Sequence, residues 1–451
     1  MKRSLLMLCI LGASLAASSQ DKSFDLSNYK FPDYKRHELE FNFNSSGNGR
    51  KYTTDSPDYL NNGVITNYVS SYYYSQSSVV LNYNYNYLTR KRIDFLHSSI
   101  SGNYNYSSSS DITDKLKDSS PGFDLTLNGS RALYLTENKF FLEGMSDLSY
   151  NQNNSKSYVN NLLQTKYFST NIDLSIGVGI GKGRMEMVSD LWQAYYILEK
   201  LKKQKSLSKE LTNDNVYDFA YLASRLKNKR FFDARLREIA ELQSLDSLLH
   251  KQGLIANNDI AYFTTLNDYW SYGNFQDRQS GRVLKFWLSP EYARQYNKTS
   301  GNTSLLSYKT SLSSNISYTC TKQLNLYWER HIYLSISNES VLDTTGRNYN
   351  SYPKNNFSSN VKFGYGFFPD SRTSISASLQ YTLEKLIVVN PAGDVPKEWL
   401  NRIYFNLTGY YYLSPQLQIT GSFYLTYSDK DYKMTNNLFT QYNLGLRYAI
   451  F

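Results

Sequence analysis

The residues best suited to acid–base chemistry are Glu329 and His331, an acid and an imidazole two positions apart. Alternate residues of a strand point to the same side, so the two side chains share one face of the predicted strand. Of the four histidines in the chain, only His331 can be given such a partner from the sequence. A carboxylate beside a base is an arrangement used in hydrolysis, but no nucleophile or second acid can be positioned here. We therefore interpret the pair as two solvated side chains and predict no catalytic residue and no enzyme.

Four alternating glycines, Gly177, Gly179, Gly181 and Gly183, lead into a predicted helix. A phosphate-binding loop needs a specific glycine spacing so that its backbone N–H groups can surround the phosphate. Here the spacing is strictly alternate and no Gly-Lys-Ser/Thr sequence follows, so we expect no nucleotide. Instead, the glycines are expected to thin the wall of a sheet or to let the following segment pack closely against it.

The sequence contains no pattern for a metal or another cofactor. Neither the His and Cys spacing of a zinc or haem site nor the acidic loop of a calcium site is present, so the sequence predicts no metal and no cofactor. The chain has two cysteines, and Cys9 lies in a predicted export signal, which leaves Cys320 alone in the mature chain. No internal disulfide is therefore expected.

Charged residues of both signs fall on the polar face of the predicted strands, among many Asn, Ser and Thr. A sheet face of this kind suits the water-filled interior of a β-barrel, where a charged side chain costs little free energy and can tune solute selectivity. It predicts no preference for anions or cations. The predicted lumen-lining residues are Glu38, Glu40, Asp124, Asp147, Asp173, Lys285, Lys309, Glu329, His331, Lys362, Glu384, Arg402 and Arg447.

The stretch from Asn171 to Leu201 shows which elements position these residues. From Ile172 to Ile180, every second residue is large and apolar, and small or polar residues lie between them, which predicts a strand. After Arg184 the apolar residues recur at three and four positions, the spacing of one helix face. Similar alternating strands precede this stretch and return after residue 281.

The composition favours a large transmembrane barrel over two or three soluble domains. The chain has 451 residues, of which 43 are tyrosine, yet its mean hydropathy is −0.54. Barrels in membranes combine aromatic girdles with a polar interior in this way. The net charge of +10 is spread along the chain rather than clustered, which argues against a nucleic-acid partner.

The N-terminus predicts export. Lys2 and Arg3 precede an apolar run from Leu5 to Leu15 and then small residues, which is the pattern of a cleaved signal peptide over residues 1–19. A membrane anchor is the alternative, but the apolar run is too short for one. Residues 20–35 are expected to form a polar lead-in.

We predict an all-β transmembrane antiparallel barrel of about 14 strands, within a range of 12–16, and a helical insert between strands 6 and 7. The first six strands occupy residues 36–180, beginning with strands near 38–43 and 79–87, and residues 61–75 could contain further strand. The insert covers 181–280, with helices near 186–204, 213–228 and 231–251. Residues 257–271 form a further helical segment, which packs on the others or lies in the membrane interface. The remaining eight strands occupy residues 281–451.

Connection lengths predict the sidedness of the barrel. The expected short turns are Thr321–Lys322, Pro369–Ser371 and Ser414–Pro415, and the longest loop is Asn338–Asn355. Turns are short on the periplasmic side of bacterial barrels and loops are long outside. This assignment puts the insert and both chain ends in the periplasm. One charged residue, Arg330, falls on the apolar face, which implies a bulge or a position at the rim.

The C-terminal Leu444–Phe451 run, the Tyr-rich strands and the export signal resemble outer-membrane β-barrel proteins of Gram-negative bacteria. Gly181–Arg184 and Arg230–Arg235 resemble an uncharacterised subgroup of these barrels with a periplasmic helical insertion. The resemblance implies an outer-membrane location and recognition by the barrel-assembly machinery. In this sequence Phe451 is out of step with the terminal strand.

These features lead to two functional hypotheses. The first is a porin-like channel for small polar solutes in which the insert is a periplasmic cap or docking module. The alternative is a non-conducting outer-membrane scaffold whose insert binds envelope partners in secretion or polysaccharide export. Lipid, the assembly machinery and a periplasmic protein on the insert are the expected partners, and the sequence defines no oligomeric state.

Overall fold

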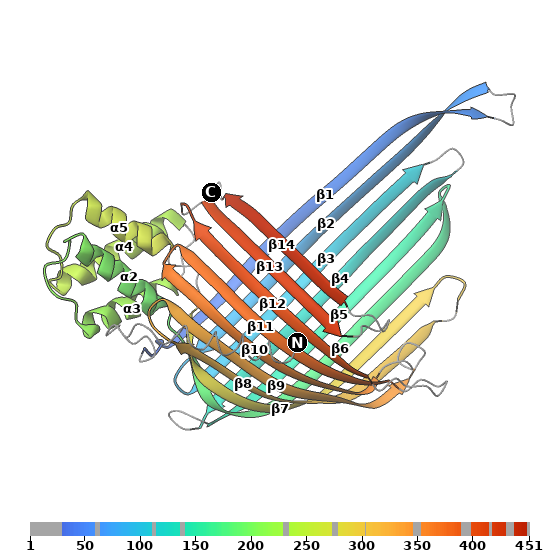
Figure 1. Cartoon of the computed structure of the whole chain (residues 1–451). Coiled ribbons are helices and arrows are strands. Elements are labelled where there is room, and N and C mark those ends of the chain that lie inside the picture. The colour runs from blue at the N-terminus through green and yellow to red at the C-terminus, as the bar shows by residue number, and fades with distance from the viewer. Residues whose placement is uncertain are drawn as a thin grey trace.

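The structure, a computed structural model, describes residues 29–58, 64–110, 114–135, 140–228, 234–272, 278–302, 304–345, 353–388, 398–414, 417–429 and 437–448. Within these ranges the chain forms one antiparallel sheet of fourteen strands, interrupted once by four helices (Figure 1). The predicted fold class, strand number and place of the insert are thereby confirmed. The predicted signal peptide lies outside the described residues.

The strands follow one another in the sheet in chain order, each beside its neighbour in sequence. The first six are β1 (Tyr34–Asp58), β2 (Val64–Leu88), β3 (Arg92–Ser110), β4 (Lys115–Tyr134), β5 (Phe140–Val159) and β6 (Leu162–Met187). The other eight are β7 (Gln279–Thr299), β8 (Leu305–Gln323), β9 (Trp328–Thr345), β10 (Pro353–Asp370), β11 (Thr373–Val388), β12 (Glu398–Tyr412), β13 (Leu417–Asp429) and β14 (Asn437–Tyr448).

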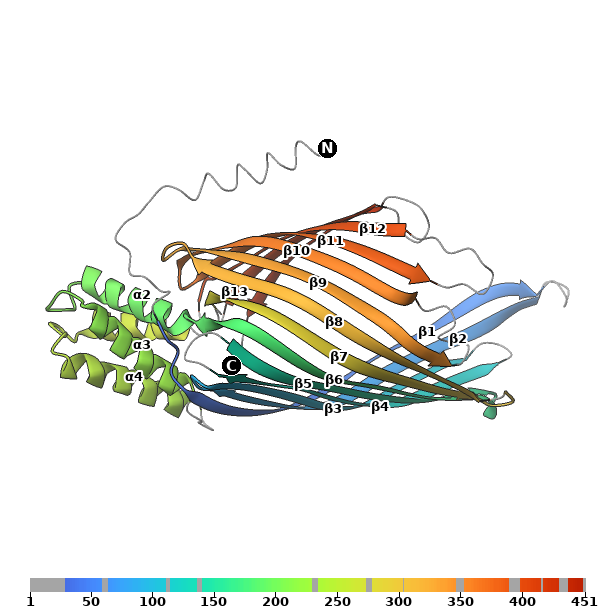
Figure 2. The ribbon, with the colours of Figure 1, turned by 90° about the horizontal axis from the view of Figure 1, so that it is seen from below.

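The sheet curls but is not closed (Figure 2). Among the described residues, β1 pairs only with β2 and β14 only with β13, so these two strands are the edges. Apolar side chains on both edges are exposed: Phe41 is 66% exposed and Leu444 is 82% exposed.

Side-chain alternation gives the sheet one apolar and one polar face across all its strands. The register aligns Leu81, Ile100, Leu125 and Tyr150 in one row on the apolar face. One residue along, Asn82, Ser99, Thr126 and Ser149 form a row on the other face. A sheet that meets lipid with one side and water with the other requires this separation.

The first hairpin is longer than the sequence pattern predicts. Beyond Phe43 and Val79 most residues are polar, yet pairing continues from Asn44 opposite Ser78 to Asp58 opposite Val64. Both strands have 25 residues, whereas about 9–11 cross a bilayer. The hairpin therefore projects beyond the other strands (Figure 1). Backbone pairing needs no apolar side chains, which is why alternation did not reveal this part.

Two predicted connections are wrong. The loop predicted at Asn338–Asn355 is largely strand, because β9 continues to Thr345 and β10 begins at Pro353. The other is the turn predicted at Thr321–Lys322. Thr321 and Lys322 lie inside β8, opposite His331 and Arg330, and the connection to β9 is 324–327. There the side-chain oxygen of Asn325 accepts hydrogen bonds from the backbone N–H groups of Tyr327 and Trp328, both at 2.8 Å. An Asn at this position favours such an Asx turn, and this is the sequence signal that would have placed the connection correctly. Arg330 follows the turn directly in unbroken register, so it occupies a rim position rather than a bulge.

The helices of the insert are α2 (Ser189–Lys203), α3 (Asn213–Lys227), α4 (Ala234–Lys251) and α5 (Ile260–Tyr272). Local signals set their ends. Thr212 and Asn215 form a capping box at the start of α3, and Gly253, with φ of +63°, ends α4. Among the described residues, no helix has the length and apolarity that a membrane span requires.

The insert has the only sizeable compact core among the described residues, built on α2. Leu191, Trp192, Ile197, Leu198 and Leu201 are all buried in it. In α5, Tyr262, Leu266 and Trp270 are buried against the other helices, so this segment packs, as one of the two predicted alternatives requires. Its outer face carries Ile260, which is 83% exposed, and Phe263.

The helices lie at the end of the sheet that carries the β8–β9 and β10–β11 turns (Figure 2). Leu326 of the β8–β9 turn and Phe368 near the β10–β11 turn belong to the core of the insert. The Tyr196 hydroxyl donates to the carbonyl oxygens of Phe368 and Pro369 at 3.1 and 3.0 Å. Tyr29, before β1, is buried against α3 and bonds to Ser224 at 3.0 Å. The insert thus packs against the segment before β1 and against two turns of the sheet, and it holds these parts in one place.

Candidate functional site: the polar face and its junction with the insert

The pairing register puts every predicted lumen-lining residue on the polar face. Glu38, for example, faces Asn84, and Asp147 faces Asn128 in the same row. Arg447 is placed by its backbone register alone, opposite Gln418. These residues therefore share one face of the sheet, as expected. That this face is the wall of a water-filled lumen stays a prediction.

Charged groups on this face are held in two ways. Two carboxylates have neutral partners: Asp124 accepts from Ser101 at 3.2 Å, and Asp147 accepts from Ser175 at 3.1 Å. Other charged groups form ion pairs between strands, namely Lys285 with Glu143, Lys309 with Glu339 and Arg402 with Glu384. Lys362 on β10 is exposed and forms no ion pair with any described carboxylate.

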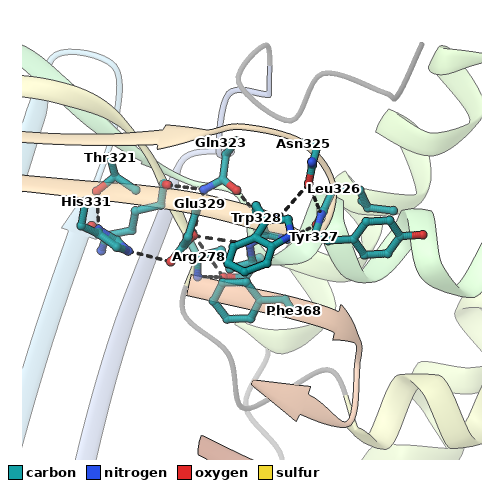
Figure 3. Close-up of polar contacts among 12 residues, drawn as sticks. Arg278, Thr321, Gln323, Asn325, Leu326, Tyr327, Trp328, Glu329, His331 and Phe368 are labelled. Carbon is teal, nitrogen blue, oxygen red and sulfur yellow. Dashed lines mark hydrogen bonds and ion pairs between the residues drawn. The ribbon is translucent and has the colours of Figure 1, made fainter. Parts of the chain in front are cut away.

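Glu329 and His331 do contact one another, at 2.7 Å between Oε1 and Nε2. The other ring nitrogen of His331, Nδ1, bonds to the Thr321 hydroxyl at 2.8 Å (Figure 3). The predicted pairing is therefore present. The prediction that both groups are solvated is wrong for Glu329, which is 3% exposed.

A third partner, Arg278, explains the burial of Glu329. Arg278 immediately precedes β7 and its side chain is fully buried between the insert and the sheet. Its Nε lies 3.4 Å from Glu329 Oε2, its Nη1 donates to the Leu326 carbonyl at 2.6 Å, and its Nη2 donates to Gln323. Gln323 in turn donates to Glu329 Oε2 at 2.9 Å. A buried ion pair is stable only when its remaining polar atoms are satisfied in this way.

The insert completes the surroundings of Arg278. Trp192 of α2 and Phe368 place their rings 5.3 and 4.5 Å from the guanidinium carbon. Ser189 accepts from the Arg278 backbone N–H at 2.7 Å. Burial lowers the pKa of Arg278 to about 10, which still leaves it charged at neutral pH. Sequence reasoning missed Arg278 because its partners lie 45 to 51 positions away, on β8 and β9.

Thr321, His331 and Glu329 have the composition of a nucleophile, a base and an orienting acid. However, Thr321 is 3% exposed, so its hydroxyl is not accessible to a substrate. Glu329 is also committed to Arg278. The arrangement suits a rigid joint between the wall and the insert better than a reacting group. In the described part of the chain, no three or more His, Cys, Asp or Glu side chains are grouped to hold a metal ion.

The alternating glycines make room for neighbouring side chains. A Cβ at Gly181 would lie 2.1 Å from the Phe141 ring, and one at Gly179 would lie 3.1 Å from Trp287 Cβ. Gly183, with φ of +109°, lies against the carbonyl oxygen of Arg282 on β7. Close packing is thus the reason for the glycines, but their partners are side chains and backbone of the sheet itself.

The alternation of faces, the up-and-down strand order and the single insert define the class: this is the architecture of an outer-membrane β-barrel protein. No known protein family and no curated protein sequence matches the chain. Solved structures that it resembles include the ferric yersiniabactin uptake receptor FyuA from Yersinia pestis, at 7% identity and a TM-score of 0.36 over 89% of this chain. The chain spans 62% of the length of that receptor.

Two further structures cover the chain more evenly. The toluene transporter TodX of Pseudomonas putida is 10% identical, with a TM-score of 0.29 over 92% of this chain and 89% of its own. The transport unit of the autotransporter AIDA-I from Escherichia coli is 11% identical, with a TM-score of 0.24 over 98% of this chain and 97% of its own.

Proposed function

We propose that the protein is an outer-membrane channel for small polar solutes whose helical insert is anchored at the periplasmic end of the wall. The observation that carries this proposal is the polar face itself. It runs across fourteen strands and exposes Lys362 and other charged groups, whereas the opposite face is mainly apolar. Charged groups are stable on such a wall only where water reaches them.

The size of the sheet supports the same function. Eight strands make a barrel that its own side chains fill, and 16 to 18 leave an aqueous channel. A closed barrel of fourteen strands lies near the wider of these limits. In this proposal β1 and β14 close the barrel in the membrane, the signal peptide is removed on export, and the barrel-assembly machinery inserts the chain.

The insert is proposed as a cap at one mouth of the barrel. Its contacts with the turns at Leu326 and Phe368 and with the lead-in at Tyr29 support a fixed position at that end. A scaffold that binds envelope partners is the second candidate. It is favoured by the outer face of α5, where Ile260 and Phe263 are exposed and could contact a periplasmic protein.

Planar-bilayer recording of the purified full-length protein tests the channel. Reproducible open steps are expected, and Lys362→Glu is expected to shift the reversal potential toward cation selectivity in a salt gradient. Lys322→Glu makes the same charge change on the opposite face at the rim and is expected to leave selectivity unchanged. Silence at all voltages and salt concentrations would reject the channel in favour of the scaffold.

A further inference from the structure

A hollow of about 530 Å³ lies on the polar face above β8–β12. It forms where Gly364 of β10 stands between His331 of β9 and Ser378 of β11 in one cross-strand row. Because Gly364 has no side chain, the wall dips there, and its neighbours form a rim. The volume lies within the range of about 300–1,000 Å³ that small-molecule sites occupy.

The rim carries one positive charge that no described carboxylate neutralises. Lys362 lines the hollow and is exposed. Glu329, two residues before His331 on β9, is buried, and its charge is balanced by Arg278. His331 contributes its ring edge but no free nitrogen, since both of its nitrogens are bonded to protein groups. The hollow therefore offers a single site for an anion.

Neutral hydrogen-bonding groups make up most of the remaining rim. They include hydroxyls and amides from three strands, namely Thr319, Ser376, Ser378, Asn406 and Thr408. Tyr333, beside Lys362 in the register, adds an aromatic ring at one side. Hydroxyl and amide groups in the rows beside one ammonium match a ligand with many hydroxyls and one negative charge.

We propose that this hollow is a binding site for a small sugar acid, with the ligand carboxylate at Lys362 and its hydroxyls at the Ser, Thr and Asn side chains. The proposal rests on the proposed channel, because the hollow must open to a water-filled lumen. It names the solute class that the channel selects. The volume admits one or two sugar rings.

Calorimetric titration of the detergent-solubilised full-length protein tests the site with D-glucuronate, D-glucose and acetate. Glucuronate is expected to bind, and Lys362→Gln to weaken it about tenfold or more, the usual effect of losing a hydrogen bond to a charged group. Lys362→Arg keeps the charge and is expected to retain binding. Lys322→Gln, on the opposite face, is the matched control for loss of one charge.

Three results would overturn the site: glucose or acetate binding as tightly as glucuronate, glucuronate not binding, or Lys362→Gln binding it as tightly as the unmodified protein. Thr408→Val is a second test, which removes a hydroxyl without changing the charge. This variant is expected to bind glucuronate more weakly in the same titration. Bilayer recording separates the two proposals. Conductance without glucuronate binding rejects the site and keeps the channel, whereas binding without conductance rejects the channel and leaves the hollow as a ligand site with no role in selecting a transported solute.

Discussion

Arg278 and Glu329 form a buried ion pair, 3.4 Å between Nε and Oε2, that joins the helical insert to the polar face of the sheet. Arg278 lies in the last segment of the insert, and Glu329 is the second residue of β9. The same carboxylate contacts His331, whose side chain reaches the hollow proposed to bind solute. The pair is thus the point at which the position of the insert and the shape of the wall are connected.

Removal of Arg278 is expected to loosen this joint. Arg278→Met leaves the Glu329 carboxylate buried without its cation, which costs about 3–5 kcal/mol of unfolding free energy. Denaturant unfolding followed by the fluorescence of Trp192 and Trp270, both buried in the insert core, measures the loss.

The double variant Arg278→Met with Glu329→Met tests the cause. Because it removes both charges, it is expected to be more stable than Arg278→Met alone. Equal stability of the single and double variants would contradict the role of the pair.

Gly183 on β6 is expected to tolerate no side chain. Gly183→Ala would place a Cβ 2.0 Å from the Arg282 carbonyl oxygen at a φ of +109°, and strained backbone of this kind costs about 1–3 kcal/mol before the clash is counted. Gly144→Ala, in neighbouring β5, meets no atom within 4 Å and is the matched control. The fraction of each variant that folds into lipid vesicles is the measurement. Equal folding of the two would show that β6 can shift freely here.

The apolar alternation of single strands made much of this fold predictable. In Ile172–Ile180 this alternation decides which residues face each side of the sheet. Because six strands, an even number, precede the insert, the chain has returned to the end at which it started, and the insert is predicted there. Pairing that uses polar residues carries no such signal, so the far half of the first hairpin, from Asn44 to Asp58, stayed hidden. The helices were found because their apolar spacing and caps are local.

The candidate site was predictable only where its residues lie on one strand. Glu329 and His331 are two positions apart, so strand periodicity alone brings them together. Arg278 reaches Glu329 only through the fold, since β7 and β9 flank β8 and the turn at Leu326 folds over the guanidinium. The same holds for the hollow, which needs a glycine on β10 beside polar residues of β9 and β11.

The insert is expected to lose stability at alkaline pH. Burial raises the pKa of Tyr29, Tyr196 and Tyr262 above the ordinary value of 10.0. The folded state therefore keeps their protons when the unfolded state releases them. Their contribution to stability is complete below pH 10 and is lost as the pH rises further.

Absorbance of ionised tyrosine, recorded with the fluorescence of the insert tryptophans during an alkaline titration, tests this order. The three tyrosines are expected to ionise together with unfolding of the insert, after the exposed tyrosines have ionised. A triple Tyr→Phe variant is expected to shift the alkaline transition upward. Unfolding of the insert at the same pH in both proteins would contradict the account.

The sharpest test of the two faces compares neighbouring residues of β8. Ile316 lies on the apolar face between Phe286 and Ile336, and Asn315 lies on the polar face between Trp287 and Ser337. On the lipid face of a barrel, arginine at the bilayer midplane costs about 2–4 kcal/mol, whereas water on the other face solvates it. Ile316→Arg is therefore expected to lower the free energy of unfolding in phospholipid vesicles by that amount, and Asn315→Arg to leave it nearly unchanged. The reverse order would mean that lipid contacts the polar face, and the channel and its solute site would then both fail.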